Sequence, residues 1–184
     1  MKILISGPQG SGKTTQAELL AADLAVPHFS SGEFLRTLAR ENSEVGRIVK
    51  KHIAAGTLIP DDLALKLVSD ELEKLEYNTG FVLEGNPRTV EQAENFKHKL
   101  DVVIYLKLPD GECVKRLLNR RRSDDTEELI KTRLTVYHKE TEPMLDYYRK
   151  LKLLHRVDGL GSIESIHNTI AEIVGIENHA AHQI

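Results

Sequence analysis

The feature that most constrains this chain is the segment Gly7–Thr14, GPQGSGKT, which follows the apolar run Ile3–Ile5 after one serine. The segment matches the pattern G-x-x-x-x-G-K-[ST], in which a glycine-rich turn joins a strand to a helix. The backbone N–H groups of such a turn face inward and form, with the helix N-terminus, a nest for an anion. Lys13 can reach the β- and γ-phosphates, and the Thr14 hydroxyl can ligate Mg²⁺. We therefore predict that the chain binds a nucleoside triphosphate with magnesium.

Apolar runs of strand length alternate along the chain with segments of helical periodicity. Strands are expected at residues 2–6, 81–84, 102–107 and 154–158, with a shorter candidate at 28–30. Helices are expected at residues 13–24, 32–41, 44–55, 61–76, 90–98, 110–120, 126–150 and 162–174. Strands separated by helices favour a parallel sheet that is covered on both faces. The predicted fold is an α/β, P-loop three-layer sandwich with a five-stranded parallel sheet flanked by helices.

Composition narrows the classes of protein and partner. With 184 residues, 40% apolar and 29% charged, the chain has the size and composition of one soluble domain. A net charge of −3 without a basic stripe argues against binding to nucleic acid or to a membrane. No signal peptide and no membrane span are recognised, so we expect a cytoplasmic protein. The single cysteine, Cys113, excludes a disulfide framework and is expected to be buried on a helix; residues 178–184 are expected to fray.

Arginines occupy positions suited to holding phosphate groups. Arg36 is expected on a helix and Arg88 directly after a strand, and four more surround the junction of helices 110–120 and 126–150, namely Arg116, Arg120, Arg122 and Arg133. The planar guanidinium can bind phosphate through two hydrogen bonds. Phosphoryl transfer depends mainly on positioning and on neutralising charge. Each arginine alone is better explained as a surface residue, but their joint arrangement predicts a phosphoryl-transfer site.

Side-chain caps are expected at two helix starts. Ser30 with Glu33 fits a capping box, and Asp125 with Glu128 resembles one. Asp125 is therefore expected to cap the helix that follows it, and its neighbour Asp124 is expected to orient nearby arginines.

Five motifs occur in the order found in the nucleoside monophosphate kinases, and the chain resembles the adenylate kinases over nearly its whole length. The motifs are GKTTQ at 12–16, SSGEFLR at 30–36, GTLIPD at 56–61, EGNPRTVEQA at 84–93, and RSDD at 122–125 with Arg133 eight positions further on. The resemblance implies reversible transfer from MgATP to AMP, giving two ADP, by direct in-line attack without a phosphoenzyme. It also implies a monomer that uses Mg²⁺ but no zinc, and whose partners are small nucleotides. A GTPase would carry an N/T-K-x-D element after a late strand, and this chain does not.

The resemblance assigns roles by position. The transferring phosphoryl group would be neutralised by Lys13, Arg88, Arg120, Arg122 and Arg133. ATP would be bound by Gly10, Ser11, Gly12, Lys13, Thr14, Thr15, Arg116, Arg120 and Gly161. AMP would be bound by Ser31, Arg36, Thr57, Leu58, Ile59, Gly85, Arg88, Gln92, Arg122 and Arg133. Magnesium would be held by Thr14 and, through water, by Glu84.

The acceptor base is inferred from Thr89 and Gln92. A glutamine amide offers a donor and an acceptor, which suit N1 and N6 of adenine. Relatives that act on pyrimidine monophosphates tend to carry asparagine after the signature arginine, where this chain has Thr89. The residues favour AMP, and a UMP/CMP-type kinase or a catalytically weak nucleotide sensor are the alternatives.

The chain departs from the family pattern in three respects. Glu33 and Glu84 stand where aspartate is usual, and Asn86 replaces an aromatic residue. Only one residue separates Arg120 from Arg122, where relatives place a lid. We expect a single kinase domain over 1–184, divided into a core at 1–29, 60–120 and 123–176, a monophosphate-binding segment at 30–59 and a vestigial lid turn at 120–123.

Overall fold

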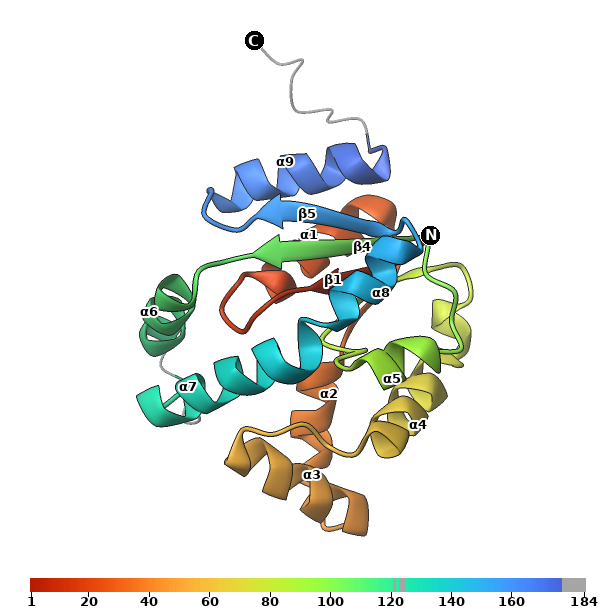
Figure 1. The fold of residues 1–184 in the computed structure, drawn as a ribbon. Helices are drawn as coiled ribbons and strands as arrows, with labels where there is room; N and C mark the ends of the chain where they lie inside the picture. The colour runs from red at the N-terminus through yellow and green to blue at the C-terminus, as the bar shows by residue number, and fades with distance from the viewer. Residues whose placement is uncertain (121, 123–124, 177–184) are drawn as a thin grey trace.

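The structure is a computed structural model that describes residues 1–120, 122 and 125–176. At its centre these residues form a five-stranded sheet, parallel throughout, with the strand order β2-β3-β1-β4-β5 (Figure 1). The strands are β1 (Lys2–Ser6), β2 (His28–Ser30), β3 (Phe81–Glu84), β4 (Val102–Lys107) and β5 (Leu154–Asp158). All five have the predicted bounds, and the predicted fold class is confirmed. The expected fraying of residues 178–184 lies outside the described residues.

Most helices lie where the sequence predicts them. Those of the described residues are α1 (Lys13–Leu24), α2 (Ser31–Leu38), α3 (Glu44–Ala55), α4 (Asp61–Leu72), α5 (Val90–Glu94), α6 (Asp110–Arg120), α7 (Glu127–Val136), α8 (Met144–Lys150) and α9 (Ile163–Val174), with a 3₁₀ turn at Leu75–Tyr77. Helices α2, α4 and α5 end several residues earlier than predicted. Within the described part of the chain, no helix combines the length and the apolar character that a membrane crossing requires.

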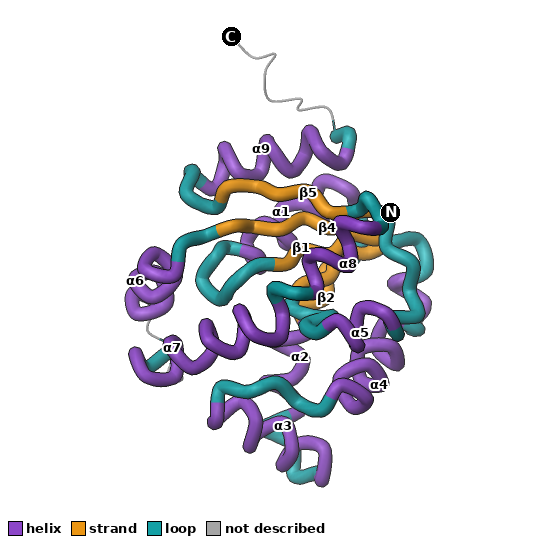
Figure 2. The backbone as a smooth tube through the Cα atoms, viewed as in Figure 1, coloured by secondary structure: helices purple, strands orange, loops and turns teal. Residues whose placement is uncertain are grey.

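Helices cover both faces of the sheet (Figure 2). Along β1, side chains alternate between the faces, as the pleat of a strand requires. Ile3 and Ile5 pack with residues of α1 and α9. Leu4 packs on the opposite face with residues of α4 and α8. Because these strand residues are fully buried, the sheet is a rigid platform for the loops at its edge.

The chain between Thr126 and Lys150 differs from the single helix that was predicted. Helix α7 ends at Val136, a π-helical turn occupies Tyr137–Thr141, and α8 begins at Met144. Within the π-turn the backbone N–H of Glu142 donates to the carbonyl of Tyr137 at 2.9 Å. Pro143 follows at once; it has no N–H and its ring would clash with the carbonyl four residues earlier in a continuous α-helix. The proline therefore accounts for the interruption that the periodicity did not reveal.

The parallel arrangement brings the carboxyl ends of β1, β3 and β4 to one edge of the sheet (Figure 1). Ligands of open α/β sheets bind at this edge, where the strand order reverses. Three loops begin there: the phosphate loop 7–12 after β1, the segment 85–89 after β3, and the turn into α6 after β4. These loops form the floor of the site described next.

Candidate functional site

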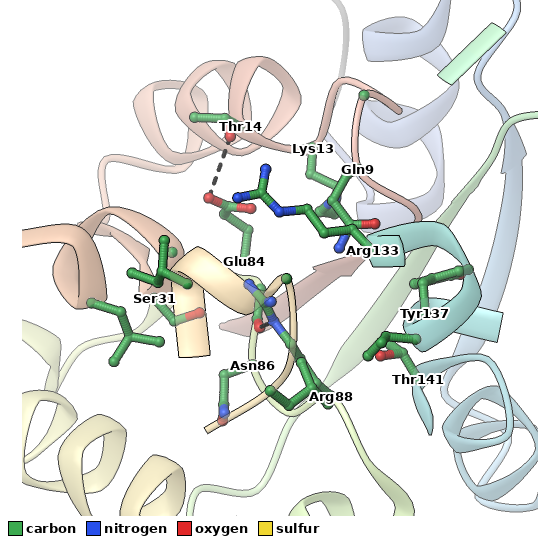
Figure 3. A pocket seen from close by; sticks show the side chains of 18 of the residues that line it. Gln9, Lys13, Thr14, Ser31, Glu84, Asn86, Arg88, Arg133, Tyr137 and Thr141 are labelled. Atoms are coloured by element: carbon green, nitrogen blue, oxygen red, sulfur yellow. Dashed lines mark hydrogen bonds between the residues drawn. The ribbon is translucent and has the colours of Figure 1, made fainter. Parts of the chain in front are cut away.

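A cavity of about 440 Å³ opens at this edge, and most of the predicted site residues line it. Figure 3 shows part of its wall, with Arg88 reaching in from the loop after β3 and Arg133 from α7. The cationic side chains on its lining are Lys13, Arg36, Arg88, Arg116, Arg120, Arg122 and Arg133. Such a concentration of positive charge around one cavity suits an anionic ligand with several phosphate groups.

The phosphate loop approaches α6 so closely that Gly10 admits no side chain. Gly10 has a φ of +86°, and a Cβ there would lie 3.0 Å from the Cys113 carbonyl oxygen and 3.1 Å from a Leu117 carbon. Cys113 is buried on α6, as predicted. The loop curls back on itself, since the Ser11 N–H donates to the Pro8 carbonyl at 3.2 Å. Close packing against α6 and this hydrogen bond thus constrain the shape of the loop.

Lys13 is partly buried, and its Nζ donates to the carbonyl of Pro8 at 2.8 Å. Loss of solvent around the ammonium lowers the pKa of Lys13 to about 8. The negative charge of Glu84 opposes this shift in pKa, whereas the positive charges of Arg88 and Arg120 add to it. The negative charge of a bound polyphosphate would raise the pKa of Lys13 again.

Glu84 lies at the end of β3 between the phosphate loop and α2 (Figure 3). It accepts hydrogen bonds from Thr14 Oγ1 at 3.3 Å and, at very short range, from Ser30 Oγ. Burial acts to raise the pKa of Glu84, but Lys13, the hydrogen bond from Ser30 and Arg88 outweigh it and hold the pKa below its usual value. Ser30 also caps α2 by accepting from the Glu33 N–H, as the sequence predicts.

The Thr14 hydroxyl and the Glu84 carboxylate are the candidate groups for magnesium. Both are oxygen donors, which Mg²⁺ prefers, and a site of one or two protein oxygens completed by phosphate and water is typical of this ion. The Glu84 side chain is longer than that of the aspartate usual in the family, and it contacts the Thr14 hydroxyl directly. Elsewhere, the described residues contain no group of three or more His, Cys, Asp or Glu side chains able to hold a metal.

Arg88 is held in place by the turn that precedes it. Its Nε donates to the Gly85 carbonyl at very short range. Gly85 has a φ of +88°, and a Cβ there would lie 2.7 Å from Ser31 Oγ and 3.2 Å from an Arg88 nitrogen. Burial lowers the pKa of Arg88; Glu84 opposes this effect, and the nearby cations Arg36 and Arg133 add to it. Three guanidinium groups therefore converge where an anion would relieve their repulsion.

Asp125 plays a different part from the one predicted. It is buried and binds Arg120 through two hydrogen bonds, Nε to Oδ2 at 2.8 Å and Nη2 to Oδ1 at 2.9 Å. Nη1 of Arg133 lies 3.5 Å from the same Oδ1. The cap of α7 is instead Thr126, whose hydroxyl accepts from the Leu129 N–H at 3.3 Å. The prediction that Asp125 caps the helix is wrong, because two arginines compete for its carboxylate; Asp124 lies outside the described residues.

Gln92 lines the cavity, and its amide makes three hydrogen bonds with neighbouring residues. Its Oε1 accepts from the Arg88 N–H at 2.7 Å and from Asn86 Nδ2 at 2.9 Å. Its Nε2 donates to Asp61 at 2.6 Å, and Asp61 also accepts from the Thr89 hydroxyl at 2.9 Å. The residue that replaces the family's aromatic, Asn86, is thus part of the network and is itself buried.

Two predicted ATP-binding residues do not line the cavity. Ser11 is buried within the phosphate loop, and Gly161 lies beside the start of α9, where a Cβ would meet Ser165 Oγ at 2.5 Å. Arg116 does line the cavity, and its Nη2 donates to the Gly159 carbonyl at 3.0 Å. The turn after β5 therefore contacts the site through Gly159.

Several lining residues were not predicted from the sequence. They are Gln9, Gly32, Leu35, Ile53, Gly56, Ala64, Asn86, Leu117, Val136, Tyr137 and Thr141. Gln9 and Gly32 lie inside recognised motifs and could have been included. Tyr137 and Thr141 carry no local signal, because only the π-turn brings both to the cavity (Figure 3). Pro143 is the one sequence feature that could have drawn attention to this turn.

Several known proteins that are similar to this chain are named adenylate kinase. A sequence profile described as adenylate kinase matches residues 5–153. Proteins named adenylate kinase from Trichodesmium erythraeum, Leptospira biflexa and Methanothrix thermoacetophila are 40%, 39% and 36% identical to this chain. The matches cover 95%, 94% and 95% of this chain and 97%, 99% and 98% of those proteins, respectively.

Proposed function

Because this chain belongs to the adenylate kinase family, we propose that it transfers the γ-phosphoryl group of ATP to AMP, reversibly and with Mg²⁺, to give two ADP. The observation that carries the proposal is the single cavity in which the phosphate loop meets six arginines. Two polyanions must approach each other for this reaction, and fixed cations lower the cost of that approach.

The donor and acceptor are proposed to occupy opposite ends of the cavity. The donor phosphates lie in the phosphate loop, with backbone N–H groups and Lys13 around them, and Arg116 lies against the donor base. The acceptor monophosphate lies between α2 and the loop after β3, where Arg36 and Arg88 converge on its phosphate. The walls of the acceptor site are the segment 57–59 and the residues Ser31, Gly85 and Gln92.

In-line attack of the acceptor phosphate needs no general base, because the attacking oxygen is already ionised at neutral pH. The protein's contribution is to hold the two phosphates in contact and to neutralise charge on the group in transit. Arg120 and Arg133 enter from α6 and α7, and Asp125 holds both guanidinium groups by accepting from them. Lys13 and Arg122 complete the proposed set.

Magnesium would be held by Thr14 directly and by Glu84 through water. Magnesium bound there would supply positive charge to the triphosphate. Glu84 also orients Thr14 and Ser30 through its two hydrogen bonds. The residue that holds the metal therefore also links the phosphate loop to α2.

We further propose that the chain is one kinase domain in which the segment 30–59 binds the monophosphate and the segment 120–123 takes the place of a lid. Arg121 and Ser123 lie outside the described residues. We also propose that the active form is a monomer, as the family resemblance implies. ATP and AMP are small molecules of the cytoplasm, so the proposed activity is placed there.

The test is an acceptor panel. The protein with MgATP is offered AMP, CMP, UMP, GMP and dTMP, and the products are separated and counted. We expect ADP from AMP, two molecules for each AMP consumed, and a loss of at least about 100-fold in kcat/KM for Arg88→Ala. Arg149→Ala, which removes an exposed arginine of α8, is the matched control and should leave the rate unchanged. Preference for CMP or UMP would favour the pyrimidine kinase, and ATP binding without transfer would favour a sensor.

A further inference from the structure

We propose that Gln92 reads the acceptor base with one N–H donor only, so that this enzyme selects monophosphates whose base carries an unprotonated ring nitrogen. The exocyclic amine of adenine is then not read by Gln92. Asn86 is the positioning residue that sets this state of the glutamine. The inference rests on the proposed function, which supplies the acceptor nucleotide.

The carboxamide oxygen of Gln92 is saturated within the protein. Oε1 accepts from the Arg88 N–H at 2.7 Å and from Asn86 Nδ2 at 2.9 Å. A carbonyl oxygen has two lone pairs, and both are used by these donors. The sequence-based expectation that the amide offers the base both an acceptor and a donor is therefore narrowed to the donor.

The orientation of this amide is fixed by partners that cannot exchange roles. A backbone N–H can only donate, and both oxygens of the Asp61 carboxylate accept, one from Gln92 and one from Thr89. A reversed Gln92 would place its NH₂ against the Arg88 N–H and its oxygen 2.6 Å from Asp61 Oδ1. Asp61 is held in turn by Thr89, whose hydroxyl donates to Oδ2 at 2.9 Å. Reversing the Gln92 amide would break its hydrogen bonds with Arg88, Asn86 and Asp61.

The hydrogen bond from Asn86 favours the same orientation of the Gln92 amide. Its Nδ2 faces Gln92 Oε1, and a reversed Asn86 amide would set two carbonyl oxygens against each other. Its own Oδ1 is buried without a partner in the described part of the chain, so the amide is oriented by what Gln92 requires. An aromatic residue at this position, usual in the family, could not donate this hydrogen bond.

What remains for a ligand is one N–H of Gln92 Nε2. No acceptor among the described residues uses it, and Gln92 lines the cavity. Such a donor matches N1 of adenine and N3 of cytosine, which both carry a lone pair. It opposes N1 of guanine and hypoxanthine and N3 of uracil, which carry hydrogen. Two opposed donors that are both buried leave two unsatisfied groups, which disfavours binding strongly.

Three purine monophosphates distinguish recognition of the ring nitrogen N1 from recognition of the exocyclic amine. AMP, purine riboside 5′-monophosphate and IMP are compared at saturating MgATP. The purine analogue lacks the amine but keeps N1, and we expect its kcat/KM within about fivefold of that for AMP. IMP carries N1–H, and we expect a loss of at least about 50-fold. A purine analogue that falls as far as IMP overturns the inference. Failure on AMP itself overturns the proposed function instead, so the two failures are distinguishable.

The isosteric variant Gln92→Glu replaces only the donating group. One oxygen still accepts from Arg88 and Asn86, and the other shares a proton with Asp61 and presents a lone pair to the base. We expect the ratio of kcat/KM for AMP to that for IMP to fall by at least about tenfold, because the base-facing group now accepts. An unchanged ratio, with both substrates losing equally, contradicts the role of the donor.

The positioning role of Asn86 is tested by Asn86→Leu, which keeps the approximate shape and removes the hydrogen bond to Gln92. We expect the KM for AMP to rise about fivefold while the KM for ATP stays within about twofold. A purely structural role would instead alter both KM values and kcat together, and that result overturns the assignment.

Discussion

Loss of solvent around Lys13 sets its charge in the free protein. The pKa of this lysine is lowered to about 8, and a bound triphosphate would raise it again. At a pH well below 8 the ammonium is protonated in both the free and the bound protein, so binding takes up almost no proton at this group. At a pH well above 8 Lys13 of the free protein is mostly neutral, so binding must take up a proton and weakens as the pH rises.

The corresponding measurement is calorimetry of MgATP binding in two buffers of different ionisation enthalpy. We expect uptake of about one proton at pH 9 and almost none from Lys13 at pH 7. Lys13→Arg keeps its charge at both values and should abolish the difference. Equal uptake at the two pH values in the unaltered protein would contradict the lowered pKa.

Two neighbouring residues at the start of α7, Asp125 and Thr126, have different roles. Asp125 binds Arg120 and lies within 3.5 Å of Arg133, whereas Thr126 caps the helix. Thr126→Ala should lower the free energy of unfolding by about 1 kcal/mol and leave the transfer rate unchanged. Asp125→Asn should lower kcat by at least about tenfold, because the two arginines lose the carboxylate that orients them. Urea unfolding and steady-state kinetics check both; a Thr126→Ala enzyme as slow as Asp125→Asn would contradict this difference in roles.

The wrong prediction for Asp125 shows that a local sequence pattern does not decide which residue caps a helix. Asp125 with Glu128 and Thr126 with Leu129 are competing starts for one helix, and local spacing does not choose between them. The choice is made by Arg120, five residues earlier, whose fork takes the carboxylate. The hydrogen bonds of Gln92 are similar, because Asn86 and Asp61 meet it only after three segments have packed.

Among the elements, the interrupted helix after Thr126 is the one that contacts both the cavity and the sheet. Helix α7 carries Arg133 to the cavity, and the π-turn brings Tyr137 and Thr141 to its wall. Helix α8 then packs on the sheet through Met144 and Tyr148. A continuous helix could not meet both demands, and the helical period alone does not report such an insertion.

Helix α8 offers a test of how a buried polar atom affects stability. The Tyr148 hydroxyl is buried without a hydrogen-bond partner in the described part of the chain, and burial raises the pKa of Tyr148. Tyr148→Phe removes a desolvated hydroxyl and keeps the ring, so the free energy of unfolding should stay equal or rise by up to about 1 kcal/mol. Tyr147→Phe, at a partly buried neighbour, is the control. A clear loss of stability in Tyr148→Phe, measured by urea unfolding, would show that the hydroxyl has a partner.

At the scale of the whole molecule, the positions of the five strands were the most predictable feature. Continuous apolar runs such as Ile3–Ile5 are what a sheet covered on both faces requires, and they were recognisable without any contact information. The lining of the cavity was predictable where it lies in the five motifs. It was not predictable where tertiary packing supplies it, as with Ile53, Leu117 and Tyr137.

The short junction between Arg120 and Arg122 has a consequence for the whole enzyme. Lids exclude water from a reacting phosphoryl group, and here a single residue separates the two arginines between which relatives place a lid. We expect ATP hydrolysis without acceptor to be about tenfold faster than in a relative with a full lid, measured side by side as phosphate release. A rate equal to or below that of the lidded relative would show that the helices α2 and α3 exclude water as effectively.

We propose above that the phosphoryl group passes directly from ATP to AMP within one cavity. The most direct test is a single-turnover experiment with [γ-³²P]ATP, excess protein and AMP, quenched over time. The account predicts that label leaves ATP and enters ADP at the same rate, with none on the protein and little as free phosphate. Label that accumulates on the protein before it reaches ADP, or that appears mainly as phosphate while AMP is untouched, would contradict it.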